Sequence, residues 1–178
     1  VPKSGKVVLL VNGAYGKRAQ RICEIAGRAT VVLETLEDTP PDVSQLAAVL
    51  EGDKAVTHVF AVHCETTSGI ANPISEVARV TAKAGRRLLV DSMSAFGALP
   101  IDAAEVQYDA LAASSNKCLE GLPGMGFVVC RTEALIASKG IIRDSHEWTE
   151  AEMWTKQQAY IAPVFTSSDA REGAAAFA

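Results

Sequence analysis

Two charged residues of the types that do covalent amine chemistry each follow an apolar stretch of the chain. Asp91 ends the stretch RRLLVD, and Lys117 comes shortly after the stretch YDALAASS. Burial of a lysine is energetically costly unless the amine is paired or used covalently, whereas a lysine on a surface loop needs no partner. A deprotonated lysine amine condenses with a carbonyl group, and a carboxylate keeps a nearby pyridine nitrogen protonated. The pair therefore has the chemistry that pyridoxal 5′-phosphate requires, namely a lysine for its Schiff base and an acid for its ring nitrogen.

Further polar residues follow the other apolar stretches. The first stretch, KVVLLV, leads into a glycine turn and Tyr15, and THVFAV leads into HCETTSG, which contains Thr67. In open parallel α/β sheets, ligands bind in the crevice beyond the carboxyl ends of the strands. At such an edge, Tyr15 could stack on the face of a cofactor ring, and Thr67 could form a hydrogen bond at the edge of that ring.

Each of these residues also has a purely structural interpretation. An aspartate at a strand end is often a turn former or a helix cap. Tyr15 could serve packing alone, and the ETTS segment could satisfy only its own backbone. The glycines of GLPGMG precede a predicted strand instead of opening a helix, so they do not fit a dinucleotide-binding loop. Cys64 and Cys118 flank the predicted site, but cysteine often fills small apolar gaps, and we assign them no role.

The elements that must position these residues follow from the pattern of apolar side chains. Strands are expected over 6–11, 30–33, 57–62, 86–91, 108–115 and 126–131. Helical spacing of apolar residues occurs at 19, 22, 23 and 26, at 43, 46, 47 and 50, and at 74, 77, 78 and 82, with a further helix over 148–160. Asp42 is placed to cap the second helix. Strands that alternate with helices predict an α/β fold with a mostly parallel sheet covered by helices, which is a three-layer arrangement.

Composition excludes several classes of function. The chain of 178 residues has a formal net charge of −4, which gives no electrostatic footprint for nucleic acid. No apolar run reaches the roughly 20 residues that a membrane helix needs, so we expect no membrane partner. The four cysteines and three histidines are scattered, which argues against a metal site and favours reduced thiols in a cytoplasmic protein.

Four motifs in sequence order resemble those of a known family: VNGAYG, HCETTSGIANPI, VDSMSAFGALPID and ASSNKCLEGLPGMGFVVCR. They resemble the class V aminotransferases, which have the fold type I architecture of pyridoxal phosphate enzymes, and within them the phosphonate branch. The resemblance implies a partial large domain: residues 1–145 would be the central part of the cofactor-binding domain, and residues 146–178 a poorly matching helical and tail segment. The small C-terminal domain is expected to be absent from this chain.

The resemblance also implies roles for five residues. Lys117 would bind the cofactor covalently and transfer the substrate proton, Asp91 would pair with the ring nitrogen, Tyr15 would cover the ring and Thr67 would touch the cofactor. Thr166, in VFTSS, would reach the cofactor phosphate of a neighbouring subunit, which implies a homodimer.

The implied reaction moves the amino group of 2-aminoethylphosphonate to pyruvate, giving phosphonoacetaldehyde and alanine. One alternative is a class V transaminase that uses serine or alanine with glyoxylate or pyruvate. Another is a non-catalytic α/β binding module, in which Lys117 is an ordinary loop residue.

Overall fold

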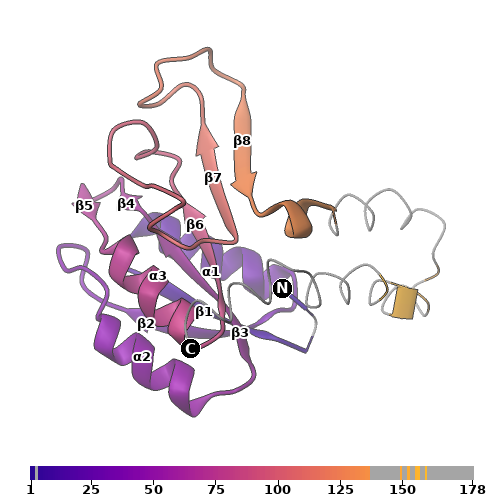
Figure 1. Ribbon diagram of the computed structural model, residues 1–178. Helices are drawn as coiled ribbons and strands as arrows, with labels where there is room; N and C mark the ends of the chain where they lie inside the picture. Colours follow the sequence, from indigo (N-terminus) through magenta and orange to yellow (C-terminus); the bar gives the residue numbers. More distant parts are fainter. Residues whose placement is uncertain (3, 137–148, 150–151, 153–154, 157–158, 160–178) are drawn as a thin grey trace. The chain divides into compact units, whose positions relative to one another are not determined.

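A computed structural model describes residues 1–2, 4–136, 149, 152, 155, 156 and 159 of the chain. The chain divides into one compact unit of Val1–Val129 and a second of Cys130–Ala178. The helix expected over 148–160 lies mostly outside the described residues. The elements are β1 (Lys6–Val11), α1 (Ala14–Ile25), β2 (Ala29–Glu34), α2 (Val43–Gly52), β3 (Val56–Val62), β4 (Cys64–Glu65), β5 (Ile70–Ala71), α3 (Ile74–Lys83), β6 (Arg87–Asp91), β7 (Ala110–Ser114) and β8 (Gly126–Cys130) (Figure 1).

The main sheet has six strands in the order β2-β1-β3-β6-β7-β8. The pairs β1–β2, β1–β3, β3–β6 and β6–β7 are all parallel. Figure 1 shows β8 running in the direction opposite to β7. The expected α/β fold with a mostly parallel sheet is therefore confirmed. The short antiparallel pair of β4 and β5 was not expected, because the sequence predicted only a loop there.

Helices cover both faces of the sheet, and the alternation along β1 shows why. Val8 and Leu10 belong to the larger apolar core, whose other members come mainly from β3, β6, β7, α2 and α3. Val7, Leu9 and Val11 point to the opposite face, where they pack with partly buried residues of α1. Successive side chains of a strand point to opposite faces, so β1 is buried on both sides. The predicted three layers are confirmed.

The helices begin and pack largely as the sequence predicts. Asp42 caps α2, since its Oδ1 accepts hydrogen bonds from the backbone N–H groups of Ser44 at 2.8 Å and Gln45 at 3.1 Å. In α1 the expected apolar stripe is wrong at Ile22, which is 57% exposed, and at Ala26, which is exposed and follows the end of the helix. Helical spacing identifies one face of a helix, but burial also needs a partner, and no described segment covers Ile22.

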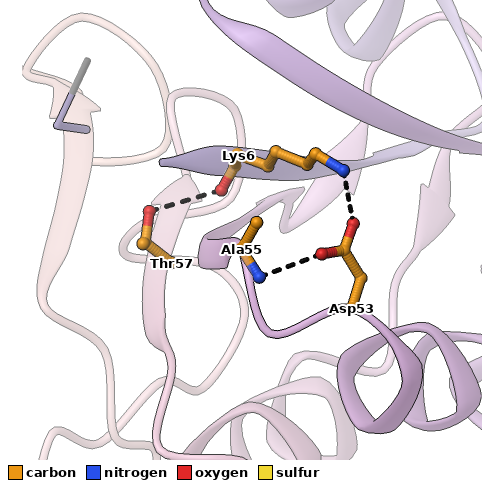
Figure 2. A network of polar contacts seen from close by, with 4 residues as sticks. All are labelled: Lys6, Asp53, Ala55 and Thr57. Atoms are coloured by element: carbon orange, nitrogen blue, oxygen red, sulfur yellow. Dashed lines mark hydrogen bonds and ion pairs between the residues drawn. The ribbon is translucent and has the colours of Figure 1, made fainter. Parts of the chain in front are cut away.

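At the edge formed by the amino ends of the strands, polar groups of the sheet and of the adjacent turn bind one another (Figure 2). Lys6 Nζ lies 2.6 Å from Asp53 Oδ2, and the other carboxylate oxygen accepts a hydrogen bond from the Ala55 N–H at 2.9 Å. Thr57 Oγ1 donates to the carbonyl oxygen of Lys6 at 3.3 Å. These bonds tie the start of β1 to the start of β3 and to the turn that precedes it.

The connections of the sheet reverse direction at β1. β2 lies on one side of β1 and β3 on the other. The chain leaves β1 through α1 on one face, whereas the chain that follows β3 reaches α3 on the other face. Such a topological switch point opens a crevice at the carboxyl ends of the two strands. This is the edge at which the predicted site residues should lie.

Candidate active site

Four predicted site residues lie at or just beyond the carboxyl ends of four adjacent parallel strands. Tyr15 lies in the first turn of α1 after β1, and Thr67 lies in the turn between β4 and β5 after β3. Asp91 is the last residue of β6, and Lys117 lies in the turn after β7. Because β1, β3, β6 and β7 are neighbours in the sheet, their carboxyl ends share one edge. The fold therefore brings these four residues, far apart in the sequence, to the same edge of the sheet. We call this edge, formed by the carboxyl ends of β1, β3, β6 and β7 and the turns that follow them, the rim.

Asp91 has one oxygen engaged and one available. In the sheet it stands between Val62 of β3 and Ala112 of β7. Its Oδ1 accepts a hydrogen bond from the backbone N–H of Met93 at 3.0 Å, so the turn-forming role is present. Its Oδ2 has no hydrogen-bond partner within the part of the chain that the structure describes. The structural interpretation therefore accounts for half of this carboxylate only.

Lys117 is exposed, in a turn that its own backbone closes. The N–H of Glu120 donates to the carbonyl oxygen of Lys117 at 2.9 Å, and the N–H of Gly121 donates to that of Ser115 at 2.7 Å. A Cβ on Gly121 would stand 3.0 Å from that Ser115 oxygen, so a side chain at this position would be a tight fit in the turn. Strand β7 ends at Ser114, and Lys117 thus lies on the exposed rim beyond it instead of in the core.

The start of α1, where Tyr15 lies, approaches the end of β1 closely at Gly16. Gly16 is buried, and a Cβ at that position would stand 2.9 Å from Val11 Cα. The missing side chain lets the helix approach the strand closely. Tyr15, next to this contact, keeps 36% of its surface exposed, so it is not consumed by packing in the core.

Thr67 is tied to its neighbours by its hydroxyl group. Its Oγ1 donates to Glu65 Oε1 at 2.9 Å and accepts a weak hydrogen bond from the N–H of Ala14 at 3.4 Å. One lone pair of the hydroxyl remains. The fifth predicted residue, Thr166, lies outside the described residues.

A chain of side-chain bonds joins three turns of the rim, and the sequence did not reveal it. Ser94 Oγ donates to the carbonyl oxygen of Cys64 at 3.0 Å, and Cys118 Sγ donates to that of Ser94 at 3.2 Å. The turn after β6 is thereby connected to the turns after β3 and β7. We assigned no role to the two cysteines, yet both help to connect these turns, Cys64 through its carbonyl oxygen and Cys118 through its thiol. Cys64 precedes Glu65, and Cys118 follows Lys117.

A buried histidine and serine lie behind the rim. His63 Nδ1 is 3.0 Å from Ser92 Oγ, both residues are buried, and burial lowers the pKa of His63 below its usual 6.5. His63 also lines a cavity of about 300 Å³ beside the start of α3, together with Asn72, Glu76 and Leu99. None of Tyr15, Thr67, Asp91 and Lys117 lines this cavity, so it is separate from the rim.

Two negative findings concern the described residues only. No three or more of their histidine, cysteine, aspartate and glutamate side chains gather closely enough to hold a metal ion. Among their helices, none has the length and apolar character needed to cross a membrane.

Comparisons with known proteins agree with this geometry. The family description "Aminotransferase class-V" matches residues 1–158. The chain is 53% identical over 140 residues to a 2-aminoethylphosphonate–pyruvate transaminase of Pseudomonas fluorescens, a match that covers 79% of this chain and 38% of that protein. A relative of the same name from Pseudomonas aeruginosa is 52% identical over the same shares. The chain thus spans less than two fifths of the length of these relatives.

Solved structures show the same fold. Pyridoxamine–pyruvate aminotransferase from Mesorhizobium loti superposes with a TM-score of 0.70 at 25% identity, covering 75% of this chain and 34% of that chain. Ureidoglycine–glyoxylate aminotransferase from Bacillus subtilis gives 0.72 at 19% identity, covering 94% and 48%, and supports the fold alone. With the family match extending over most of its length, the chain belongs to the class V aminotransferase family.

Proposed function

We propose that this protein is a pyridoxal phosphate-dependent aminotransferase that transfers the amino group of 2-aminoethylphosphonate to pyruvate. The products would be phosphonoacetaldehyde and alanine. The observation that supports the reaction type best is the placement of Asp91 and Lys117 at the ends of the adjacent strands β6 and β7, with Asp91 Oδ2 available. The choice of substrates is supported by the relatives at 52–53% identity that bear this name.

The side chains at the rim fit the cofactor. Lys117 offers an exposed amine for covalent attachment, and Asp91 Oδ2 offers an acceptor for a protonated ring nitrogen. Tyr15 offers an aromatic face, and Thr67 retains a lone pair for a donor on the cofactor rim. When bound, the cofactor supplies an electron-poor ring that accepts the electron pair left when the carbon bearing the amino group loses a proton.

Each residue then has a defined task. The Lys117 amine would take that proton from the substrate carbon as a general base. It would then deliver the proton, as a general acid, to the cofactor carbon that carries the transferred nitrogen. The Asp91 carboxylate holds the proton on the ring nitrogen, because a negative charge next to it favours the charged form. Tyr15 restrains the plane of the ring. Thr166 is proposed to reach the cofactor phosphate of a neighbouring subunit.

A homodimer follows from the same proposal, since one wall of the site would come from the partner. In support, the turn after Lys117 exposes apolar side chains: Leu119 is 44% exposed, Leu122 77% and Met125 65%. All four cysteines are free, which suits a reducing compartment such as the cytoplasm. We further propose that residues 1–145 form the central part of the large domain.

Attachment of the cofactor tests the assignment of Lys117. Borohydride reduction of the full-length protein loaded with pyridoxal phosphate should fix the cofactor to Lys117, as located by mass spectrometry of peptides. Label found on another lysine would overturn the assignment. A protein that binds no cofactor at all would support the non-catalytic module.

The amino donor is tested separately by single half-reactions. The loaded enzyme is mixed with 2-aminoethylphosphonate, serine or alanine, and the visible absorption of the bound cofactor is followed in each case. We expect the fastest loss of absorption with the phosphonate. A fast change with serine and none with the phosphonate would assign the protein to the alternative transaminases while leaving the roles of Lys117 and Asp91 unchanged.

A further inference from the structure

Glu65 is a completely buried carboxylate in a segment that the sequence presents as a polar loop. It is the second residue of β4 and has 0% of its surface exposed. Its Oε2 is buried and has no hydrogen-bond partner in the described part of the chain. Burying a carboxylate with an unsatisfied oxygen is unfavourable, so this placement calls for a reason beyond packing.

The other oxygen of Glu65 binds Thr67 twice. Oε1 accepts from the Thr67 hydroxyl at 2.9 Å and from the Thr67 backbone N–H at 3.3 Å. The same hydroxyl accepts from the N–H of Ala14, the first residue of α1. A continuous line of hydrogen bonds therefore runs from Glu65 through Thr67 to the helix that carries Tyr15.

Gly13 shows that this contact is close. Its φ of 168° is extended backbone that any residue adopts, so its conformation does not require glycine. A Cβ at Gly13, however, would stand 2.5 Å from Glu65 Cδ and 2.7 Å from Thr67 Oγ1. The carboxyl group thus packs directly against the N-cap residue of α1, which has no side-chain cap of its own. A negative charge at the start of a helix is favourable, because the helix dipole is positive there.

We propose that Glu65 is a positioning residue for the cofactor site. Its carboxylate fixes the direction of the Thr67 hydroxyl and the start of α1, so that Thr67 and Tyr15 are in place before the cofactor binds. Because the hydroxyl hydrogen is committed to Glu65, Thr67 presents only a lone pair and selects a donor on the ligand. This inference depends on the proposed function.

Two substitutions in the full-length protein separate positioning from bulk. Glu65→Gln keeps the length of the side chain and an acceptor oxygen, whereas Glu65→Leu keeps much of the volume and removes the acceptor. We expect Glu65→Leu to raise the dissociation constant of pyridoxal phosphate roughly 10-fold or more, by analogy with the loss caused when a group that orients a metal ligand is removed. The visible circular dichroism per bound cofactor should also fall, since it reports a fixed ring orientation. Glu65→Gln should restore both to within about threefold of the unchanged protein.

Gly13→Ala gives an independent variant, because it crowds Glu65 and Thr67 without removing either side chain. It should lower the cofactor affinity and the circular dichroism in the same direction as Glu65→Leu. Glu51→Leu, at an exposed glutamate of α2, is the matched control and should change neither.

The outcomes decide the proposal separately from the function. If Glu65→Leu lowers the melting temperature but leaves cofactor affinity and circular dichroism unchanged, Glu65 is structural only and the proposal is wrong. If Glu65→Gln behaves like Glu65→Leu, the acceptor oxygen is not the reason for the effect, which also overturns it. Failure of the unchanged protein to bind cofactor at Lys117 would instead refute the proposed function.

Discussion

Lysine and aspartate are arranged differently at the two edges of the sheet that are formed by the amino and by the carboxyl ends of its strands. At the amino-terminal edge, Lys6 and Asp53 form an ion pair at 2.6 Å. At the carboxyl edge, Asp91 and Lys117 come from neighbouring strands, yet no ion pair joins them. Asp53 uses both carboxylate oxygens, whereas Asp91 keeps one oxygen without a partner among the residues described.

This difference separates structural charges from charges available for chemistry. The hydrogen bond from Lys6 is the main reason why the pKa of Asp53 lies below its usual range, so that group is already satisfied. An amine and a carboxylate that remain free can bind groups of complementary charge on a ligand. Matched substitutions at the two edges test whether this contrast is functional.

The lysines should show the largest contrast. Lys117→Met should lower turnover by about 10³-fold or more, because it removes both the proposed attachment point and the proposed proton-transfer group. Lys6→Met should leave turnover within about twofold. Steady-state kinetics on both variants, with unfolding curves to confirm that each is folded, provide the comparison. Equal losses at the two positions would contradict the assignment of the carboxyl edge as the active site.

The aspartates should differ by a smaller factor. Asp91→Asn should reduce turnover roughly 10²-fold while the cofactor still binds, since a neutral amide no longer stabilises the charged ring nitrogen. Asp53→Asn should reduce the melting temperature slightly and leave turnover per folded molecule unchanged. If Asp91→Asn instead loses stability with normal turnover, the turn formed with Met93 is the whole role of this residue.

His58, near the start of β3, should make the stability of the fold depend on pH under acidic conditions. Burial is the main cause that lowers the pKa of His58 from 6.5 to about 3, and the positive charge of Arg87 adds to it. Between these pH values the unfolded chain binds a proton that the folded chain excludes, so stability falls with decreasing pH and is unaffected above pH 6.5. The loss over the whole window is up to roughly 5 kcal/mol, at 1.36 kcal/mol per pH unit.

Replacing His58 should remove this part of the acid sensitivity. In urea unfolding at pH 7, 5 and 4, His58→Gln should lose less stability on acidification than the unchanged protein. Parallel curves for the two proteins would show that His58 is not the group responsible.

The ion pair of the amino-terminal edge should have the smallest effect. Its side chains are 38% and 29% exposed, and partly exposed pairs contribute little. Breaking it with Lys6→Met should shift the melting temperature by no more than about 3 °C, and less in 1 M salt. Because the pKa of Asp53 is lowered, its contribution is present above its usual pKa of 3.8 and is lost as the pH falls below that value. A larger shift that salt does not reduce would point to lost packing.

Most of the fold could be predicted from local patterns. The apolar runs of β1, β3 and β6 and the cap at Asp42 depend on residues close together in the sequence, and all are found as expected. The common edge of Asp91 and Lys117 followed from the general rule for parallel sheets, without knowledge of the strand order.

The remaining features depend on partners far away in the chain. Glu65 reads as part of a polar loop, and its burial results from Gly13 and Ala14, which no local pattern connects to it. Ile22 has the right spacing for burial, but spacing does not supply a covering segment. Lys117 is exposed because β7 ends before it, and strand ends are the least certain part of such a prediction.

The strand order has a consequence for the sequence of events during folding. The rim needs the ends of β1, β3, β6 and β7, so its residues extend from Tyr15 to Lys117, and every neighbouring pair is joined through a long crossover. Contacts between segments so distant form slowly, because the intervening chain must first be ordered. On the ribosome the chain emerges from its N-terminus, so the acid and the amine become neighbours only after β7 has been made and has joined β6. Cofactor attachment at Lys117 would therefore mark a molecule whose sheet has already been assembled across these strands.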